Sequence, residues 1–396
     1  MQKKLIALAV AGLASTAAFA QTNVTIYGLV DYGYSYRWDG KSLGNQIPGA
    51  NTGTPNSQSQ LNGGQSLGNR IGFKGTEDLG NGLKAVFLLE QGFMLDTGMQ
   101  QTANSQFTRQ AYMGLSGNFG TAVGGRLYSP HYTFVSGLDP FGAGTVGRYN
   151  NVYSPGAAAA GVVGGSLMDP VRLDNAVAYI SPSFLGGLTA TLAFSNNAAG
   201  QEDANSNSNN NTVYAGLLKY DNGPITVGAN YHYINGGSRL SDTTPTALGV
   251  KSVQNATLGG SYDFKVVKVM ALYSWNEVDY TVNPRFLGNT SGNATINNYM
   301  LGATAPFGKF VGKASYIYSD GNRSAGGDAQ QFALGLDYNL SKRTALYSAY
   351  SFIDNQDQRF GATGDASNSG AFGSGNGYAY GGVFQQGVQV GVRHMF

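Results

Sequence analysis

The residue types that most often perform enzymatic chemistry are few and scattered in this chain of 396 residues. There is no cysteine, and the three histidines are His131, His232 and His394. Gly64, Ser66 and Gly68 match the G-x-S-x-G pattern of a nucleophilic serine, which requires a strand–turn–helix setting and a histidine partner. Here the pattern lies in a polar stretch before an expected strand. We therefore predict that the protein is not an enzyme and holds no cofactor and no metal ion.

Charged side chains, the other chemically active groups, are also sparse. They make up 12% of the chain, whereas a soluble domain has about 25%. Glycine is abundant, with 59 residues, and 42% of the chain is hydrophobic. This composition argues against an ordinary cytosolic enzyme and against a disordered chain. Beyond residue 20 the chain carries 22 basic and 22 acidic residues, so no charge excess indicates a nucleic-acid partner.

The first twenty residues have the organisation of a secretory signal peptide. Lys3 and Lys4 precede a mainly apolar stretch, and the sequence Ala-Phe-Ala at 18–20 fits the small-x-small cleavage pattern. We expect residues 1–20 to be a cleaved signal peptide and residues 21–396 to form a single domain. An N-terminal membrane anchor is the alternative.

Alternation of apolar and polar residues with a period of two dominates the rest of the chain. Near the C-terminus, the apolar residues on one face are Val388, Val390 and Val392, and the residues opposite are Gln385, Gln389 and Arg393. Aromatic residues at strand ends, as in 32–38, are typical of the interfacial girdle of a membrane barrel. A sheet in lipid must close, because every backbone group needs a partner. We predict an all-β transmembrane barrel, with a secreted sandwich as the alternative.

The connections between the expected strands alternate in length. Short turns, such as 77–82 and 305–308, alternate with long polar stretches, such as 201–211 and 354–382. This alternation is the signature of antiparallel barrels with short periplasmic turns and long extracellular loops. We count sixteen strands between Asn23 and Phe396. A barrel of that size leaves an aqueous channel at its centre.

Several segments, in order, resemble the general porins of Gram-negative outer membranes, and most closely their beta-proteobacterial branch. They are 24–31, 68–85, 108–116, 124–126, 175–182 and 390–396. The resemblance implies a homotrimer of sixteen-stranded barrels in the outer membrane, surrounded by lipid and lipopolysaccharide. It implies that the third extracellular loop folds inward and narrows each channel. It also implies that Phe396 is an assembly signal, recognised by the barrel-assembly machinery.

The resemblance places the pore constriction between the third loop, within residues 127–170, and the barrel wall. In the loop, residues 139–142 resemble the family's constriction segment, with Asp139 as their one acid. Asp139 can also form an Asx turn before Pro140, and the two roles are compatible.

Basic residues occupy matching positions on the expected barrel wall. The candidates for the constriction are Arg70, Arg109, Arg126 and Arg172. Further pore-lining candidates are Lys74, Lys84, Asp31 and Glu90. The alternation supports Arg70, because Ile71 and Phe73 face lipid. It leaves Arg109 ambiguous. For each arginine, the alternative is a solvated wall residue without a special role.

We therefore expect a water-filled channel for passive diffusion of small hydrophilic solutes and ions. A mild anion preference follows if the arginines outnumber nearby carboxylates, although Asp31, Glu90 or Asp174 could offset them. A substrate-specific channel that uses Tyr128, Tyr132 and Phe134 is one alternative. The long loops 38–67 and 354–382 leave an adhesin or surface receptor as another.

Overall fold

The computed structural model describes residues 23–39, 57–153, 170–198, 200, 202, 211–236, 250–280, 292–321, 328–355 and 384–396. The expected signal peptide, residues 1–20, lies outside the described residues. So do residues 40–56 and 356–382, which make up most of the two long loops that motivated the adhesin alternative.

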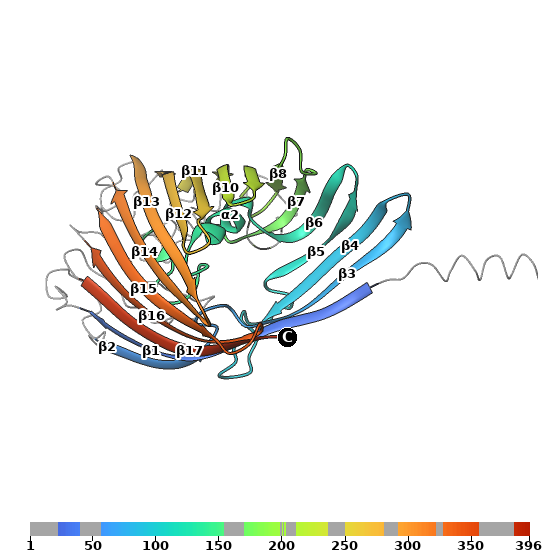
Figure 1. The fold of residues 1–396 in the computed structure, drawn as a ribbon. Coiled ribbons are helices and arrows are strands. Elements are labelled where there is room, and N and C mark those ends of the chain that lie inside the picture. Colours follow the sequence, from blue (N-terminus) through green and yellow to red (C-terminus); the bar gives the residue numbers. More distant parts are fainter. Residues whose placement is uncertain are drawn as a thin grey trace, which may run out of the picture.

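The described chain is almost entirely β-structure, with two short helices inside the third long connection (Figure 1). The elements are β1 (Asn23–Asp39), β2 (Ser57–Gly63), β3 (Arg70–Gly80), β4 (Leu83–Gly92), β5 (Gln110–Gly117), β6 (Gly120–Tyr128), α2 (Pro130–Leu138), α3 (Asn150–Tyr153), β7 (Arg172–Ile180), β8 (Leu188–Ser195), β9 (Val213–Asn222), β10 (Ile225–Asn235), β11 (Val250–Asp263), β12 (Lys268–Tyr280), β13 (Gly292–Phe307), β14 (Phe310–Gly321), β15 (Ala329–Asn339), β16 (Thr344–Asn355) and β17 (Phe384–Met395). Neither of the helices described is long and apolar enough to cross a bilayer.

The strands form one closed antiparallel sheet. Strand β1 pairs with β17 along one edge and with both β2 and β3 along the other. Because β2 and β3 lie end to end along β1, they share one position in the barrel. The seventeen segments therefore form a closed barrel of sixteen strand positions, which confirms the predicted fold class.

The first long connection is shorter than the sequence predicted. We expected a loop over residues 38–67, but residues 57–63 form β2 and pair with β1 from Tyr32↔Gly63 to Trp38↔Ser57. The prediction was wrong there because the segment Ser-Gln-Ser-Gln-Leu-Asn-Gly has little intrinsic strand preference. Pairing with β1 supplies the hydrogen bonds that its own composition does not favour.

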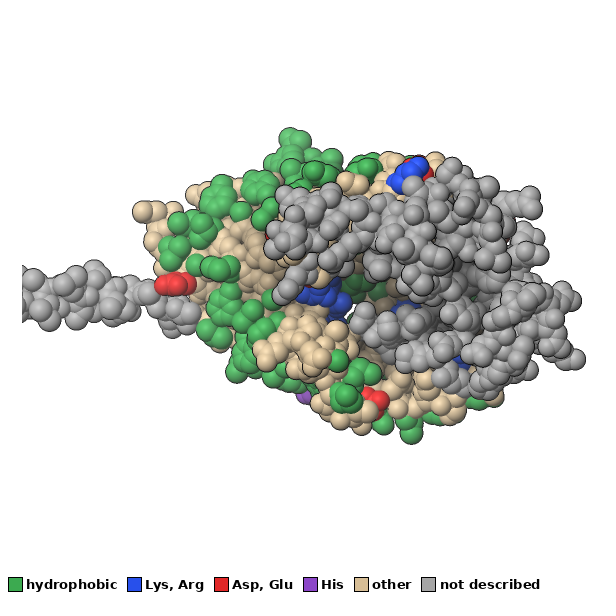
Figure 2. Space-filling view, turned by 180° about the vertical axis from the view of Figure 1, so that it is seen from behind, with side chains coloured by type: hydrophobic (Ala, Val, Ile, Leu, Met, Phe, Trp, Pro, Cys, Tyr) green, Lys and Arg blue, Asp and Glu red, His purple; other side chains and the backbone are tan. Residues whose placement is uncertain are grey.

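The predicted alternation appears as alternating exposure along the strands. On β10, Val227 and Tyr231 are exposed on the outer face, whereas Asn230 and His232 are buried on the inner face. Hydrophobic side chains cover much of the outer surface in the space-filling view (Figure 2). This distribution is what a barrel with lipid outside and a polar lumen requires.

The third long connection contains α2 and α3, and both helices lie against the inner wall of the barrel. Ser129 caps α2, because its Oγ accepts a hydrogen bond from the Tyr132 backbone N–H, and Pro130 occupies the first turn. Helix α2 packs against β8–β12, and α3 packs against β14 and β15.

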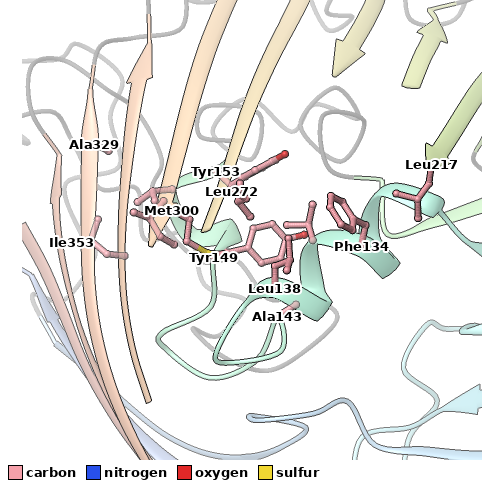
Figure 3. Packing of buried hydrophobic residues seen from close by; sticks show 13 residues of the cluster. Phe134, Leu138, Ala143, Tyr149, Tyr153, Leu217, Leu272, Met300, Ala329 and Ile353 are labelled. Atoms are coloured by element: carbon pink, nitrogen blue, oxygen red, sulfur yellow. The ribbon is translucent and has the colours of Figure 1, made fainter. Parts of the chain in front are cut away.

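Hydrophobic burial holds this loop to the wall (Figure 3). The loop contributes Phe134, Val135, Leu138, Ala143, Tyr149, Val152 and Tyr153 to the cluster. The wall contributes Leu217, Leu272, Met300, Ile317, Ala329 and Ile353. A fully buried side chain of this kind contributes about 1.5–3 kcal/mol relative to an exposed one. The cluster therefore fixes the loop inside the lumen.

Glycines on the inner wall form notches for successive loop side chains. A Cβ at each would lie 2.5–2.8 Å from the loop, and the pairs are Gly228 with Phe134, Gly259 with Leu138, Gly302 with Pro140 and Gly335 with Phe141. Real Cβ atoms do not approach other heavy atoms that closely. These four positions therefore need glycine for close approach of the loop.

We expect Gly302→Val to push the segment around Pro140 off the wall, toward the centre of the lumen, and to lower the single-channel conductance. Overpacking of this kind costs about 1–3 kcal/mol. Conductance in planar bilayers measures the effect. Gly216→Val is the matched control, because a Cβ there meets only a Leu192 side-chain carbon, at an ordinary 3.6 Å. Equal conductance in both variants would contradict the notch interpretation.

Candidate functional site

The described part of the inward loop, residues 129–153, is uncharged where it is accessible. Within the described residues 129–153, the exposed or partly exposed side chains are Tyr132, Thr133, Ser136 and Asn150, beside Gly137 and Gly142. The two charged residues of this segment, Asp139 and Arg148, are 6% and 4% exposed. This part of the loop therefore presents polar but uncharged groups to the lumen.

Both oxygens of the Asp139 carboxylate accept hydrogen bonds from backbone N–H groups of the loop. Oδ1 accepts a hydrogen bond from Phe141 N at 3.0 Å, and Oδ2 accepts from Ala143 N at 2.9 Å and Tyr149 N at 3.1 Å. The bond to Phe141 N is the Asx turn that the sequence had left open. Burial nonetheless raises the pKa of Asp139 to about 6, although the three N–H groups act in the opposite direction.

This raised pKa has a consequence for stability. An unfolded aspartate has a pKa near 3.8, so between pH 7 and pH 4 the folded protein takes up a proton that the unfolded chain does not. The free energy of unfolding should therefore increase as the pH falls through 6, by about 2–3 kcal/mol at most. We expect Asp139→Asn to remove this dependence in thermal unfolding of the detergent-solubilised protein.

The control for that measurement is Asp263→Asn, an exposed turn aspartate that also accepts a backbone hydrogen bond, from Lys265 N. It should keep the dependence of the wild type. If Asp139→Asn keeps it too, the Asp139 carboxyl group is not its source.

The tip of the loop is fastened to the opposite wall through a turn at 64–69. Thr145 N donates to Gln65 O at 2.8 Å, and Val146 N donates to Gln389 Oε1 at 2.9 Å. The two glutamine side chains are joined as well, by Gln389 Nε2 to Gln65 Oε1 at 2.6 Å. Gln65 is completely buried. The loop is therefore held at both of its sides.

Asp31 holds this turn in place. Its Oδ2 accepts hydrogen bonds from Ser66 N at 2.9 Å and Leu67 N at 2.8 Å, and its Oδ1 accepts from the Tyr347 hydroxyl at 2.7 Å. Asp31 is completely buried. Ser66, the central residue of the G-x-S-x-G pattern, lies in this turn, which leads into strand β3 and not into a helix.

We expect Gln65→Ala to release the loop tip and to increase open-channel current noise. It removes a buried side chain with three hydrogen bonds, at about 1–3 kcal/mol for each buried group left unpaired. Gln254→Ala is the control, since it loses one exposed hydrogen bond, from the Tyr231 hydroxyl. Current as quiet as in the control would contradict this role of Gln65.

An arginine–tyrosine cluster occupies the wall formed by β3, β4, β6 and β7 and consists of Arg70, Arg109, Arg172, Glu90 and Tyr128. Arg109 is its centre, since Nε donates to Glu90 Oε1 at 2.7 Å and Nη2 donates to the Tyr128 hydroxyl at 2.7 Å. Glu90 also accepts from the Tyr27 hydroxyl at 2.7 Å. The alternation left Arg109 ambiguous because Ala111 and Met113 share its phase. In the structure Arg109 precedes the first residue of β5, so the alternation of that strand does not apply to it.

Two further guanidinium groups flank Arg109. Arg70 donates from Nε to Gly68 O at 3.0 Å, and Arg172 lies over the Tyr128 ring, 5.3 Å from its centroid. The charge of Arg109 acts on both of them. The cluster thus contains three cations and one carboxylate. Basic side chains are visible in the hollow near the middle of Figure 2.

The other predicted basic residues lie apart from this cluster or are neutralised. Arg126 forms an ion pair with Asp174 and donates from Nε to Thr108 O. Lys74 lies over the Tyr27 ring, 5.4 Å from its centroid. Lys84 is exposed, next to the short turn between β3 and β4.

Phe396 lies where the first strand, β1, meets the last strand, β17. Its backbone exchanges two hydrogen bonds with Gly28, at 3.0 and 3.1 Å, and its ring covers Gly28. The side chain is 47% exposed on the outer side.

A second charged group was not singled out from the sequence. Lys313 and Arg393 share the Asp337 carboxylate, with N···O distances of 2.9 and 2.7 Å. Arg393 also donates to Ser66 Oγ at 3.1 Å. The alternation of the last strand placed Arg393 on the polar face. It could not identify the residues that Arg393 contacts elsewhere in the chain. Among the described residues, no group of three or more histidine, cysteine or acidic side chains could hold a metal ion.

Comparison with known proteins identifies the fold and the family. The sequence pattern of the Gram-negative porins matches residues 7–358. The chain belongs to this porin family. It is 32% identical, over the whole of both chains, to outer membrane porin protein 32 of Delftia acidovorans. It is 33% identical to an outer membrane porin of Bordetella pertussis, over 90% of this chain and 95% of that one.

A solved structure supports the same assignment. The anion-selective porin from Comamonas acidovorans matches with a TM-score of 0.75 and 30% identity, over 95% of this chain and all of that one. The chain is thus an outer-membrane β-barrel porin, which confirms the predicted family, fold and location. Its barrel surrounds a channel through which solutes pass.

Proposed function

We propose that this porin conducts small hydrophilic solutes passively, with a mild preference for anions. The observation that carries the proposal is an imbalance of accessible charge. The arginine–tyrosine cluster on the wall contains three guanidinium groups and one carboxylate, whereas in the described part of the inward loop the Asp139 carboxylate is buried under three backbone N–H groups. Rings and clusters of one sign of charge set the selectivity of a pore.

The strength of electrostatic interactions between nearby charges favours the same conclusion. At an effective dielectric constant of about 20, two unit charges about 4 Å apart interact by about 4 kcal/mol. Glu90 compensates Arg109, to which it is bonded, so Arg70 and Arg172 carry the excess positive charge. Salt in the lumen screens this potential, which is why the preference is mild. The similarity of this chain to the anion-selective porin from Comamonas acidovorans supports this proposal.

We further propose that this chain forms a homotrimer in a membrane of lipid and lipopolysaccharide, as the family resemblance implies. The outward, terminal position of Phe396 suits recognition by the barrel-assembly machinery. Cleavage after Ala20 is part of the same proposal. The porin family and the barrel favour a channel over an enzyme.

The reversal potential under a KCl gradient in a planar bilayer tests the selectivity. We expect an anion-signed potential in the wild type. The double variant Arg70→Gln, Arg172→Gln keeps the bonded pair of Arg109 and Glu90 and should bring the chloride-to-potassium permeability ratio close to one.

The matched control is Lys342→Gln, Arg343→Gln, which removes two exposed charges from the short turn after β15 and should leave the ratio unchanged. A cation-signed potential in the wild type would overturn the proposal. The same follows if the arginine double variant keeps the full anion preference.

A further inference from the structure

A hollow on the inner wall lies next to the arginine–tyrosine cluster, on strands β1, β3, β4 and β5. Its volume is about 350 Å³, within the range of about 300–1,000 Å³ that is typical of small-molecule sites. Lys74 lines the hollow, four residues after Arg70 on the same face of β3. Since a strand rises about 3.4 Å per residue, Lys74 lies about 13 Å along the wall from Arg70, toward the short turn between β3 and β4.

Strand pairing determines which side chains share the hollow with Lys74. Six of them come from two neighbouring rows across the sheet, namely Thr25, Lys74, Leu88 and Tyr112, followed by Thr76 and Val86. Alternate residues of a strand share a face, so Val86 and Leu88 face the lumen together with Glu90. The hollow therefore opens into the channel and not into the lipid.

The charge of Lys74 is accessible from the lumen. Its side chain is exposed, and Nζ lies 5.4 Å from the centroid of the Tyr27 ring. Lys74 forms no hydrogen bond or ion pair with any other residue that the structure describes. An ammonium group has three N–H donors. These donors are therefore available to an anion that passes along this wall.

The surroundings of Lys74 combine polar and apolar groups. The exposed Thr25 and Thr76 lie beside it on β1 and β3, and the partly exposed Val86 and Leu88 lie on β4. Leu88 is directly opposite Lys74 in the register. A carboxylate that accepts hydrogen bonds from Lys74 Nζ would therefore place its hydrocarbon chain over the two aliphatic side chains.

The charges around the hollow favour an anion with a single negative charge. Lys74 is the one cation among the residues that line it. Glu90 lies two residues beyond Leu88 on the same face of β4 and would repel a second carboxylate on the same solute.

We propose that this hollow is a binding site for monocarboxylates with an aliphatic chain, and that it binds them in preference to monocarboxylates with a polar chain. Lys74 binds the carboxylate, and Val86 and Leu88 contact the chain. The inference rests on the proposed anion-conducting channel and adds a second site and a class of solute to it. A polar chain would gain the contact with Lys74 alone, whereas an aliphatic chain also loses apolar surface to water.

Block of the chloride current tests the inference, with the full protein in planar bilayers in KCl. Hexanoate, gluconate and acetate are added in turn, and the concentration that halves the current is measured for each. Hexanoate and gluconate carry the same charge and the same number of carbons, but only hexanoate has an apolar chain. We expect hexanoate to block at a concentration about tenfold lower than gluconate, as burial of about two methylene groups predicts. Acetate should also block more weakly than hexanoate.

Two variants on β4 assign this preference to the hollow. Leu88→Asn removes apolar surface at similar side-chain length and should bring the ratio between hexanoate and gluconate close to one. Val86→Thr exchanges one methyl group for a hydroxyl and should lower the ratio part of the way. The double variant Arg70→Gln, Arg172→Gln should keep the ratio, because neither arginine lines the hollow.

Variants of Lys74 test the charged end of the site. Lys74→Gln should raise the half-blocking concentration of hexanoate about tenfold, since a hydrogen bond between charged partners is lost. Lys74→Arg keeps the charge and should keep the block. The matched control is Lys342→Gln, which removes an exposed lysine from the turn after β15 and should leave the block unchanged.

The possible failures can be told apart. A cation-signed reversal potential in KCl would overturn the anion preference on which the inference rests. An anion-signed potential with equal block by hexanoate and gluconate would overturn the binding site alone. Retention of the full ratio by a conducting Leu88→Asn channel would overturn the role of the β4 side chains. Block by hexanoate that is as strong in a conducting Lys74→Gln channel as in the wild type would overturn the role of Lys74.

Discussion

Hydrogen bonding of the backbone in lipid is the constraint on which the rest of this structure depends. An unpaired N–H or C=O group in hydrocarbon costs several kcal/mol, so a membrane-spanning sheet cannot have a free edge. The pairing of β1 with β17 and with β2 and β3 meets this requirement. Closure then divides every strand into an outer face for lipid and an inner face for water. All selectivity must be built from inward side chains and from whatever the lumen encloses.

The third loop shows how a polar lumen holds an ordered segment. Apolar groups at inward positions, such as Leu272 and Met300, give the loop a surface on which to bury its own side chains. Glycine notches let the loop approach the backbone of the wall. The same packing buries Asp139 and turns its carboxylate toward backbone N–H groups. Attachment of the loop and the electrostatic character of the channel therefore have a common cause.

Local periodicity predicted the barrel well, because the two faces of each strand meet different solvents. The outward phase of Tyr231 and the inward phase of His232 follow directly from alternation. The docking of the third loop could not be predicted from the loop itself. A signal existed in the wall, where Leu272 and Met300 are apolar at inward positions, but only a lumen already occupied by the loop explains them.

Tertiary contacts decided the details of the site that the sequence left open. Tyr149, ten residues beyond Asp139, supplies one of the three N–H groups to its carboxylate, which no local turn rule predicts. Arg109 escapes the alternation because it stands one residue before β5. The pairing of Glu90 with Arg109 joins residues on different strands, so composition could offer both charges without showing that they neutralise each other.

The attachment of the loop tip also bears on the order of assembly. Val146 is bonded to Gln389, 243 residues later in the chain, and Thr145 is bonded to Gln65, which itself contacts Gly33 and Gln389. These partners come together only where the first and last strands meet. Contacts of such long sequence separation form late in folding. A barrel whose first and last strands have not yet paired therefore cannot hold the loop tip in place. The fixed loop tip is itself a mark of completed closure.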